Sequence, residues 1–151
     1  MLYLNRYPFA YEYALTTYRM DHPFTTVVDV RYRDLDPLGH VNHAVHVSYL
    51  EVARVEYFEQ ILDVDLTAVE TAIASVDIAY HRPITPDGQL VVEMQVTDIG
   101  TTSLTTEAEL RVDGEQAASA TVVMVNYDRE KRAAQPIPDA WREAITAFEG
   151  L

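Results

Sequence analysis

The sequence predicts an α+β domain in which one long helix packs against an antiparallel sheet of about five strands, with a short helix at the C-terminus. Three observations indicate this fold class. A strand-like segment near the N-terminus is followed by a helical segment of about twenty residues, and further strand-like segments then come in succession. Short turns separate these later segments, and short turns favour antiparallel pairing.

The first strand is expected over residues 24–33, where apolar and polar residues alternate in the segment FTTVVDVRYR. Val30 and Tyr32 would share its apolar face. The long helix is expected over residues 42–62, with Asn42 as N-cap because its side-chain oxygen can accept a first-turn N–H. Apolar residues surround most of this helix, so we expect the sheet or a partner subunit to enclose it.

The later part of the chain predicts consecutive strands and a closing helix. The strands are expected over residues 72–82, 89–99, 103–112 and 115–128. Asp113-Gly114, between the last two, is a strong signal for a tight hairpin. The segment PDAWREAITAF, residues 138–148, places Trp141 and Ile145 on one stripe and therefore predicts a short helix.

Length and composition indicate one globular domain. The chain has 151 residues, of which 48% are hydrophobic. No apolar run approaches the roughly 18 residues that a membrane-spanning helix needs. The absence of cysteine excludes disulfide bonds and thiol catalysis. Because the first residues do not resemble a signal peptide, we expect a cytoplasmic protein.

The charge balance argues against several kinds of partner. There are 24 acidic and 11 basic residues, which gives a net charge of −13. This charge repels phosphate backbones and anionic lipid, so neither nucleic acid nor a membrane is an expected partner. Lys131 is the only lysine. Such an acidic surface fits a salt-loving source or an ordinary acidic protein.

Residues 1–22 are expected to be an N-terminal extension that precedes a domain over residues 23–151. Five of the ten tyrosines lie in this extension. Two interpretations stay open: Met20 is the true start of the protein, or the tyrosines form a helix that packs on the domain.

The junction between the first strand and the long helix carries the most informative motif. Residues 34–43 read DLDPLGHVNH. This run resembles the D-x-D-x-x-G-x-V signature of the 4-hydroxybenzoyl-CoA thioesterase family, in which it leads into the central helix. The segments YLEVAR (49–54), HRPI (81–84) and PIPDAWREAI (136–145) are similar to that family as well. The resemblance covers residues 24–148 and implies the hot-dog fold, in which the sheet wraps around the long helix.

The resemblance implies a role for each residue of the motif. Asp36 matches the catalytic carboxylate of the family, which attacks the thioester or activates a water molecule. His43 matches the position at the helix start whose backbone N–H polarises the thioester carbonyl. His40 and Asn42 match a G-H-V-N variant of the motif.

Elementary chemistry supports the same assignment. Thioester hydrolysis builds negative charge on the carbonyl oxygen, and a helix N-terminus offers unpaired N–H donors with about half a positive charge. A carboxylate in the preceding turn reaches the same volume and can act as base or nucleophile. We therefore expect Asp36 to be catalytic and the backbone amides of Asn42 and His43 to bind the oxyanion.

Each candidate also has a structural interpretation. Asp34 and Asp36 could cap the turn, because Asp before Pro-x-Gly is common turn chemistry. His43 could act through its backbone alone. Glu51 could be a second active-site acid, or a buried carboxylate that pairs with Arg54 or with a backbone donor.

No metal or separate cofactor is expected. His40, His43 and His46 recur at three-residue spacing. However, His40 lies in the turn, and the sequence has neither cysteine nor an HExxH arrangement.

Coenzyme A would enter only as part of the substrate, and its phosphates call for positive charge near the site. The candidate cations are Arg82, Arg129, Lys131 and Arg132. A charge cluster in a loop is otherwise simply solvated, so both interpretations stay open.

The predicted function is hydrolysis of a small-molecule acyl-CoA to a free acid and CoA. The resemblance also implies a homodimer or homotetramer, often with the site at the subunit interface. Two other functions stay open: a hot-dog module that binds acyl-CoA or fatty acid without turnover, and an enoyl-thioester hydratase. The sequence leaves open the acyl group, the pathway and the choice between attack by Asp36 and activation of water.

Overall fold

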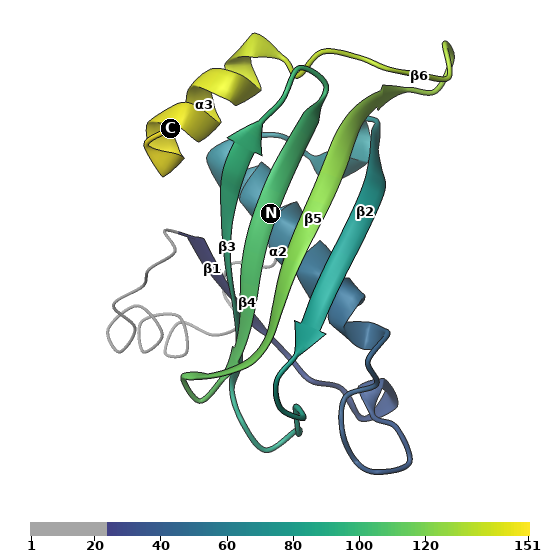
Figure 1. Cartoon of the computed structure of the whole chain (residues 1–151), viewed down its shortest axis with the longest axis vertical. Helices are drawn as coiled ribbons and strands as arrows, with labels where there is room; N and C mark the ends of the chain where they lie inside the picture. Colours follow the sequence, from purple (N-terminus) through teal and green to yellow (C-terminus); the bar gives the residue numbers. More distant parts are fainter. Residues whose placement is uncertain (1–23) are drawn as a thin grey trace.

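The computed structural model describes residues 24–151, in which a long helix lies across one face of an antiparallel sheet (Figure 1). The extension expected over residues 1–22 lies outside the described residues. The strands are β1 Phe24–Val28, β2 Thr71–Tyr80, β3 Leu90–Ile99, β4 Ser103–Val112, β5 Glu115–Asp128 and β6 Ala133–Ala134. The helices are α2 Val45–Ile61 and α3 Asp139–Glu149, with the 3-10 turns η1 Tyr32–Asp34 and η2 Leu66–Ala68.

The strands pair in the order β1-β3-β4-β5-β2, and β6 pairs with the end of β5. All of these pairs are antiparallel, as predicted. Asp113 and Gly114 have φ angles of 48° and 86°, which is the positive-φ pair of a type I′ hairpin turn. β2 pairs with β5 along one side and therefore forms an edge of the sheet.

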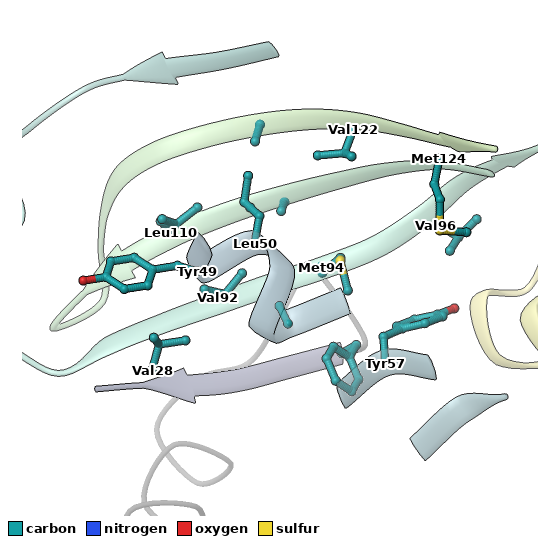
Figure 2. Packing of buried hydrophobic residues seen from close by; sticks show 14 of the residues in the cluster. Val28, Tyr49, Leu50, Tyr57, Val92, Met94, Val96, Leu110, Val122 and Met124 are labelled. Carbon is teal, nitrogen blue, oxygen red and sulfur yellow. The ribbon is translucent and has the colours of Figure 1, made fainter. Parts of the chain in front are cut away.

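The core lies between α2 and the facing side of the sheet. Figure 2 shows Leu50 of α2 directed at side chains from the central strands. The sheet contributes Val92, Met94 and Val96 from β3, Leu110 from β4, and Val122 and Met124 from β5. This arrangement of one helix against a curled antiparallel sheet confirms the predicted hot-dog fold.

α3 closes one end of this core. The ring of Trp141 packs edge-on against Phe58 of α2, with the ring centroids 5.2 Å apart. At the far end of α3, one carboxylate oxygen of Glu149 accepts hydrogen bonds from the Tyr57 hydroxyl (2.8 Å) and from the Val96 N–H (2.9 Å). One short helix is thereby tied to both α2 and β3.

The structure corrects the predicted extent of the first strand. β1 ends at Val28, and Tyr32, which the alternation places on the apolar face, is 92% exposed. Val28 pairs with Leu90, which is the first residue of β3, so the chain beyond Val28 has no partner strand there among residues 24–151. The Arg31 N–H instead bonds to the Asp34 carboxylate at 2.9 Å, and this local bond favours the turn η1.

Within residues 24–151, no helix is both long enough and apolar enough to cross a membrane.

Candidate active site

The motif at residues 34–43 forms a tight loop between η1 and α2. Leu35 and Val41 pair in an isolated antiparallel bridge, and the Asp36 N–H donates to the His40 carbonyl oxygen at 2.7 Å. The Val41 N–H donates to the Ile84 carbonyl oxygen at 2.8 Å. The loop is therefore anchored to the segment that follows β2, where the sequence reads HRPI.

Asp36 has one bonded and one open carboxylate oxygen. Its Oδ1 accepts the backbone N–H groups of Leu38 (2.8 Å) and His40 (3.2 Å), so the turn-capping interpretation is confirmed. Its Oδ2 accepts no hydrogen bond from the residues that the structure describes. The turn thus fixes the carboxylate through one oxygen and leaves the other oxygen available for chemistry.

Asp34 is buried and has structural bonds only. Its Oδ2 accepts the Arg31 N–H and the Tyr49 hydroxyl (3.0 Å), and its backbone oxygen accepts the Asn42 N–H at 2.8 Å. Burial and the bond to Asp34 raise the pKa of Tyr49, which keeps this hydroxyl protonated as a donor. Asp34 thus joins η1, α2 and the loop at one point.

The start of α2 differs from the prediction. The helix begins at Val45 with Ala44 as N-cap, because Asn42 bonds locally instead. The Asn42 Oδ1 accepts the Ala44 N–H (3.0 Å), and the Asn42 carbonyl oxygen accepts the Val45 N–H (2.9 Å).

These bonds distinguish between the two expected oxyanion donors. The Asn42 N–H already donates to Asp34, as described above. The His43 N–H has no acceptor among residues 24–151, and His43 is exposed. His43 is therefore the donor that the loop leaves open.

No pattern in the sequence indicated the environment of this amide. Tyr80, at the end of β2, donates its hydroxyl to the His43 carbonyl oxygen at 3.0 Å, and its ring lies edge-on to His46 at 4.9 Å. His46 is 4% exposed, and burial lowers its pKa. In the sequence, the one feature that draws attention to Tyr80 is its position directly before the HRPI segment.

The three histidines at three-residue spacing lie in different environments. His46 lies in the core, whereas His43 is exposed. Within the described part of the chain, no three His, Asp or Glu side chains are grouped so that they could hold a metal ion.

Glu51 lies on α2, away from the motif. Its carboxylate pairs with Arg54, as in the structural interpretation, but its side chain is 49% exposed, so the expected burial is wrong. Arg54 is only 11% exposed, and its Nε and Nη1 atoms are buried without a hydrogen-bond partner among the described residues. Both side chains line a hollow between α2 and the sheet together with Val47, Ile73 and Val76.

The candidate cations lie at opposite ends of β2. Arg82 follows the β2 end that carries Tyr80, and it pairs with Glu115 at 3.2 Å. The Arg129 N–H bonds to Glu70, at the other end of β2 (Figure 1). At about 3.3 Å per residue, the length of β2 separates these two ends by about 30 Å.

The loop at residues 129–132 is charged and exposed. Lys131 pairs with Asp128 at 2.8 Å, and Arg132 is exposed. Within one chain, therefore, only Arg82 among the expected phosphate contacts lies near the end of β2 that contacts the motif.

Comparison with known proteins shows similarity over most of the chain. A family model described as Thioesterase-like superfamily matches residues 30–145. A solved thioesterase from Thermus thermophilus, complexed with coenzyme A and Zn, is 39% identical; the match covers 87% of this chain and 98% of that one, with a TM-score of 0.80.

Two further relatives are less similar in sequence. A predicted thioesterase from Bacillus stearothermophilus is 27% identical, with coverage of 83% of this chain and 95% of that one and a TM-score of 0.76. The uncharacterized protein YsmA from Bacillus subtilis is 27% identical over 124 residues, which are 81% of this chain and 84% of that protein.

Proposed function

The chain belongs to the thioesterase-like superfamily, and from this premise we propose that it is an acyl-CoA thioesterase that releases a free acid and CoA. The observation that carries the proposal is the loop at residues 34–43. It combines an open carboxylate oxygen on Asp36 with an open backbone N–H on His43. The Thermus relative was solved with coenzyme A, which supports acyl-CoA as the substrate class.

In the proposed reaction, the thioester carbonyl oxygen accepts a hydrogen bond from the His43 N–H, which stabilises the negative charge that develops there. Asp36 takes a proton from a water molecule as this water attacks the carbonyl carbon. The C–S bond then breaks, the acid leaves, and the CoA sulfur takes up a proton. Direct attack by Asp36 would instead form an anhydride that water hydrolyses.

Residues 34–43 also support the assignment of the chain to one family within this superfamily. We propose that the chain is a member of the 4-hydroxybenzoyl-CoA thioesterase family, because residues 34–43 match its signature. The carboxylate and the amide suffice for the reaction, so the proposal includes no resident metal or separate cofactor.

We propose further that the active protein is a dimer formed through β2 and the adjacent face of α2. β2 is an edge strand, and Val47, Ile73, Val76 and Tyr80 beside it are exposed by 38–50%. An edge strand with exposed apolar side chains is a template for pairing with another chain. The buried donors of Arg54 also lack an acceptor within residues 24–151, and a second copy can supply one.

Two-fold symmetry gives this dimer a consequence for the site. A strand that pairs with its own copy about a two-fold axis is antiparallel to it, so opposite ends become neighbours. The loop with Arg129, Lys131 and Arg132 of one chain would then lie near the Asp36 loop of the other. The pairing thereby brings together cations and site residues that lie about 30 Å apart along β2 in one chain.

The test measures thiol release from short-chain, long-chain and aromatic acyl-CoAs, at low and at molar salt. We expect the substitution Asp36→Asn to lower the rate on the best substrate by at least about 100-fold, because it removes the base or nucleophile. Asp98→Asn, at an exposed position of β3, is the matched control and should keep wild-type activity.

Two outcomes would contradict the proposal. If no acyl-CoA is cleaved under any condition, the protein is not an acyl-CoA thioesterase, and tight binding of acyl-CoA would then favour a binding module. Loss of the conjugated absorbance of an enoyl-CoA without thiol release would favour a hydratase instead.

A further inference from the structure

Two side chains from different elements bind the carbonyl groups on either side of the His43 N–H. The Nδ1 atom of His46, on α2, lies 3.2 Å from the Asn42 carbonyl oxygen. The hydroxyl of Tyr80, on β2, donates to the His43 carbonyl oxygen at 3.0 Å. Because a carbonyl oxygen only accepts hydrogen bonds, Nδ1 of His46 carries a proton.

The geometry of the peptide bond makes these contacts relevant to the open amide. The His43 N–H and the Asn42 carbonyl belong to one planar trans unit, in which they point in opposite directions. Fixing the Asn42 carbonyl therefore fixes the direction of the His43 N–H. A hydrogen bond to the carbonyl also polarises the whole unit and so strengthens its N–H as a donor.

The surrounding bonds leave this unit little freedom. The Asn42 carbonyl oxygen also accepts the Val45 N–H at 2.9 Å, and the next N–H, of Ala44, is held by the Asn42 side chain. On the far side, the Tyr80 hydroxyl binds the second carbonyl. The loop therefore has bonds to both neighbouring carbonyls, while the His43 N–H itself has none among the described residues.

Packing holds the His46 side chain in place, and the exposed Tyr80 ring rests against it. The ring of Tyr80 meets the ring of His46 edge-on, with centroids 4.9 Å apart and planes at 86°. His46 is almost fully buried, and its ring also lies 6.4 Å from that of Tyr49, whose hydroxyl bonds to Asp34. A buried imidazole between two tyrosine rings cannot move without disturbing both contacts.

We propose that His46 and Tyr80 are positioning residues that aim the His43 N–H at the thioester oxygen and hold it there during the reaction. They act through the backbone of residues 42–44. This inference rests on the proposed function, because it assigns the direction of the amide that the thioesterase reaction would use. It also explains why Tyr80 extends from the sheet edge to the start of α2.

The first test is Tyr80→Phe, which removes the donating hydroxyl and keeps the ring. We expect kcat to fall about 10-fold, less than the 100-fold or more typical when an oxyanion donor itself is removed, with KM within about twofold of wild type. Tyr57→Phe is the matched control, because it removes a hydroxyl bonded to Glu149 away from the motif. It should lower the melting temperature and leave kcat unchanged.

A pair of substitutions at His46 tests the second contact. His46→Asn keeps an N–H donor at the position of Nδ1, whereas His46→Leu keeps an apolar side chain without a donor. We expect His46→Asn to retain several-fold more kcat than His46→Leu. Equal kcat in the two variants would overturn the role of His46.

A measurement without substrate separates this inference from the proposed function. The NMR order parameter of the His43 amide should be near 0.85 in the wild type, as for rigid backbone, and should fall toward 0.6 in Tyr80→Phe. An unchanged order parameter would overturn the inference even if kcat falls, because Tyr80 would then act on the substrate directly. A lowered order parameter would support it even if no acyl-CoA is cleaved.

Three kinetic results for Tyr80→Phe would overturn the inference as well. One is a kcat within about twofold of wild type, below the loss expected when an oxyanion donor is misdirected. Another is a rise in KM alone, which would indicate that the Tyr80 hydroxyl contributes equally to binding the substrate and the transition state. The third is a loss of activity that matches the loss of folded protein.

Discussion

At the scale of single residues, the two aspartates of the motif show how position decides role. Asp34 is buried and accepts bonds from Arg31 and Tyr49, so its carboxylate has structural partners. Asp36 lies two residues further along, and only one of its oxygens is bonded within the part of the chain that the structure describes. His46 is buried on α2, where desolvation lowers its pKa. Because Asp34 and Asp36 are the same residue type, the difference between them arises from burial and from their hydrogen-bond partners.

The buried imidazole of His46 predicts a pH-dependent stability. Its pKa in the folded protein lies below the ordinary value of 6.5, so the unfolded chain binds the proton more readily. The contribution of the His46 imidazole to the free energy of unfolding is therefore fully present above about pH 6.5. It is lost as the pH falls through the folded-state pKa, at up to about 1.4 kcal/mol per pH unit. Urea unfolding of wild type and His46→Leu between pH 8 and pH 5 should show a steeper loss for the wild type.

The control for this measurement is His81→Gln, which removes an exposed imidazole that bonds to Ser119 and is not among the groups that shift the pKa of His46. It should lose stability with falling pH as steeply as the wild type. If His46→Leu also runs parallel to the wild type, the buried imidazole does not cause the pH dependence.

At the scale of elements, α3 is held by a long-range contact at its last residue. Glu149 accepts the Tyr57 hydroxyl of α2 and the Val96 N–H of β3 through one oxygen. The β3–β4 register shifts between Val96 and Asp98, so this N–H lies at an irregularity of the strand. Burial and the bond to Glu149 raise the pKa of Tyr57, which keeps its hydroxyl a donor.

The substitution Glu149→Ala should lower the free energy of unfolding by about 2–3 kcal/mol, because two partly buried donors lose their acceptor. Glu143→Ala, on the exposed face of α3, is the matched control and should change it by less than about 0.5 kcal/mol. Both values come from urea unfolding followed by circular dichroism. Equal effects of the two substitutions would show that the Glu149 contact does not anchor α3.

At the scale of the whole molecule, the arrangement of charge agrees with a site built from two chains. The net charge of −13 makes a cluster of exposed cations unusual in this protein, and Arg129, Lys131 and Arg132 form one. In one chain this cluster lies about 30 Å along β2 from the end that contacts the motif. The proposed two-fold pairing of β2 removes this separation.

Mixing two impaired proteins tests the pairing. One protein is Asp36→Asn, and the other carries Arg129→Ala, Lys131→Ala and Arg132→Ala. If the cations act across the dimer, each mixed dimer has one complete site, and random exchange should restore about a quarter of wild-type activity at low substrate concentration. If the cations act within their own chain, the mixture should not exceed the mean of the two proteins.

The control places Val76→Asp in both proteins, because this substitution puts a charge on the exposed apolar side chains beside β2. Val76→Asp should dissociate the dimer, so the mass measured by sedimentation should approach the 17.1 kDa of one chain. The restored activity should then be lost. Ala68→Asp, at an exposed position in η2, should change neither. A wild-type protein that sediments as a monomer would contradict the proposed dimer.

The sequence by itself determined the features that depend on neighbours along the chain. These are the strands with their period of two, the hairpin at Asp113-Gly114, the short closing helix and the turn capped by Asp36. The structure decided features that depend on distant partners. β1 ends where β3 begins to pair with it, at Val28 and Leu90, and not where its alternation of residues ends.

The open amide of His43 and the contacts around it belong to this second group. Tyr80 lies 37 residues from the carbonyl that it binds, and Glu149 lies 92 residues from Tyr57. The sequence predicted an oxyanion site at the helix start, because unpaired amides are a local property of any helix. It could not show which amide stays free, because that depends on strand register and on the packing of the helix against the sheet.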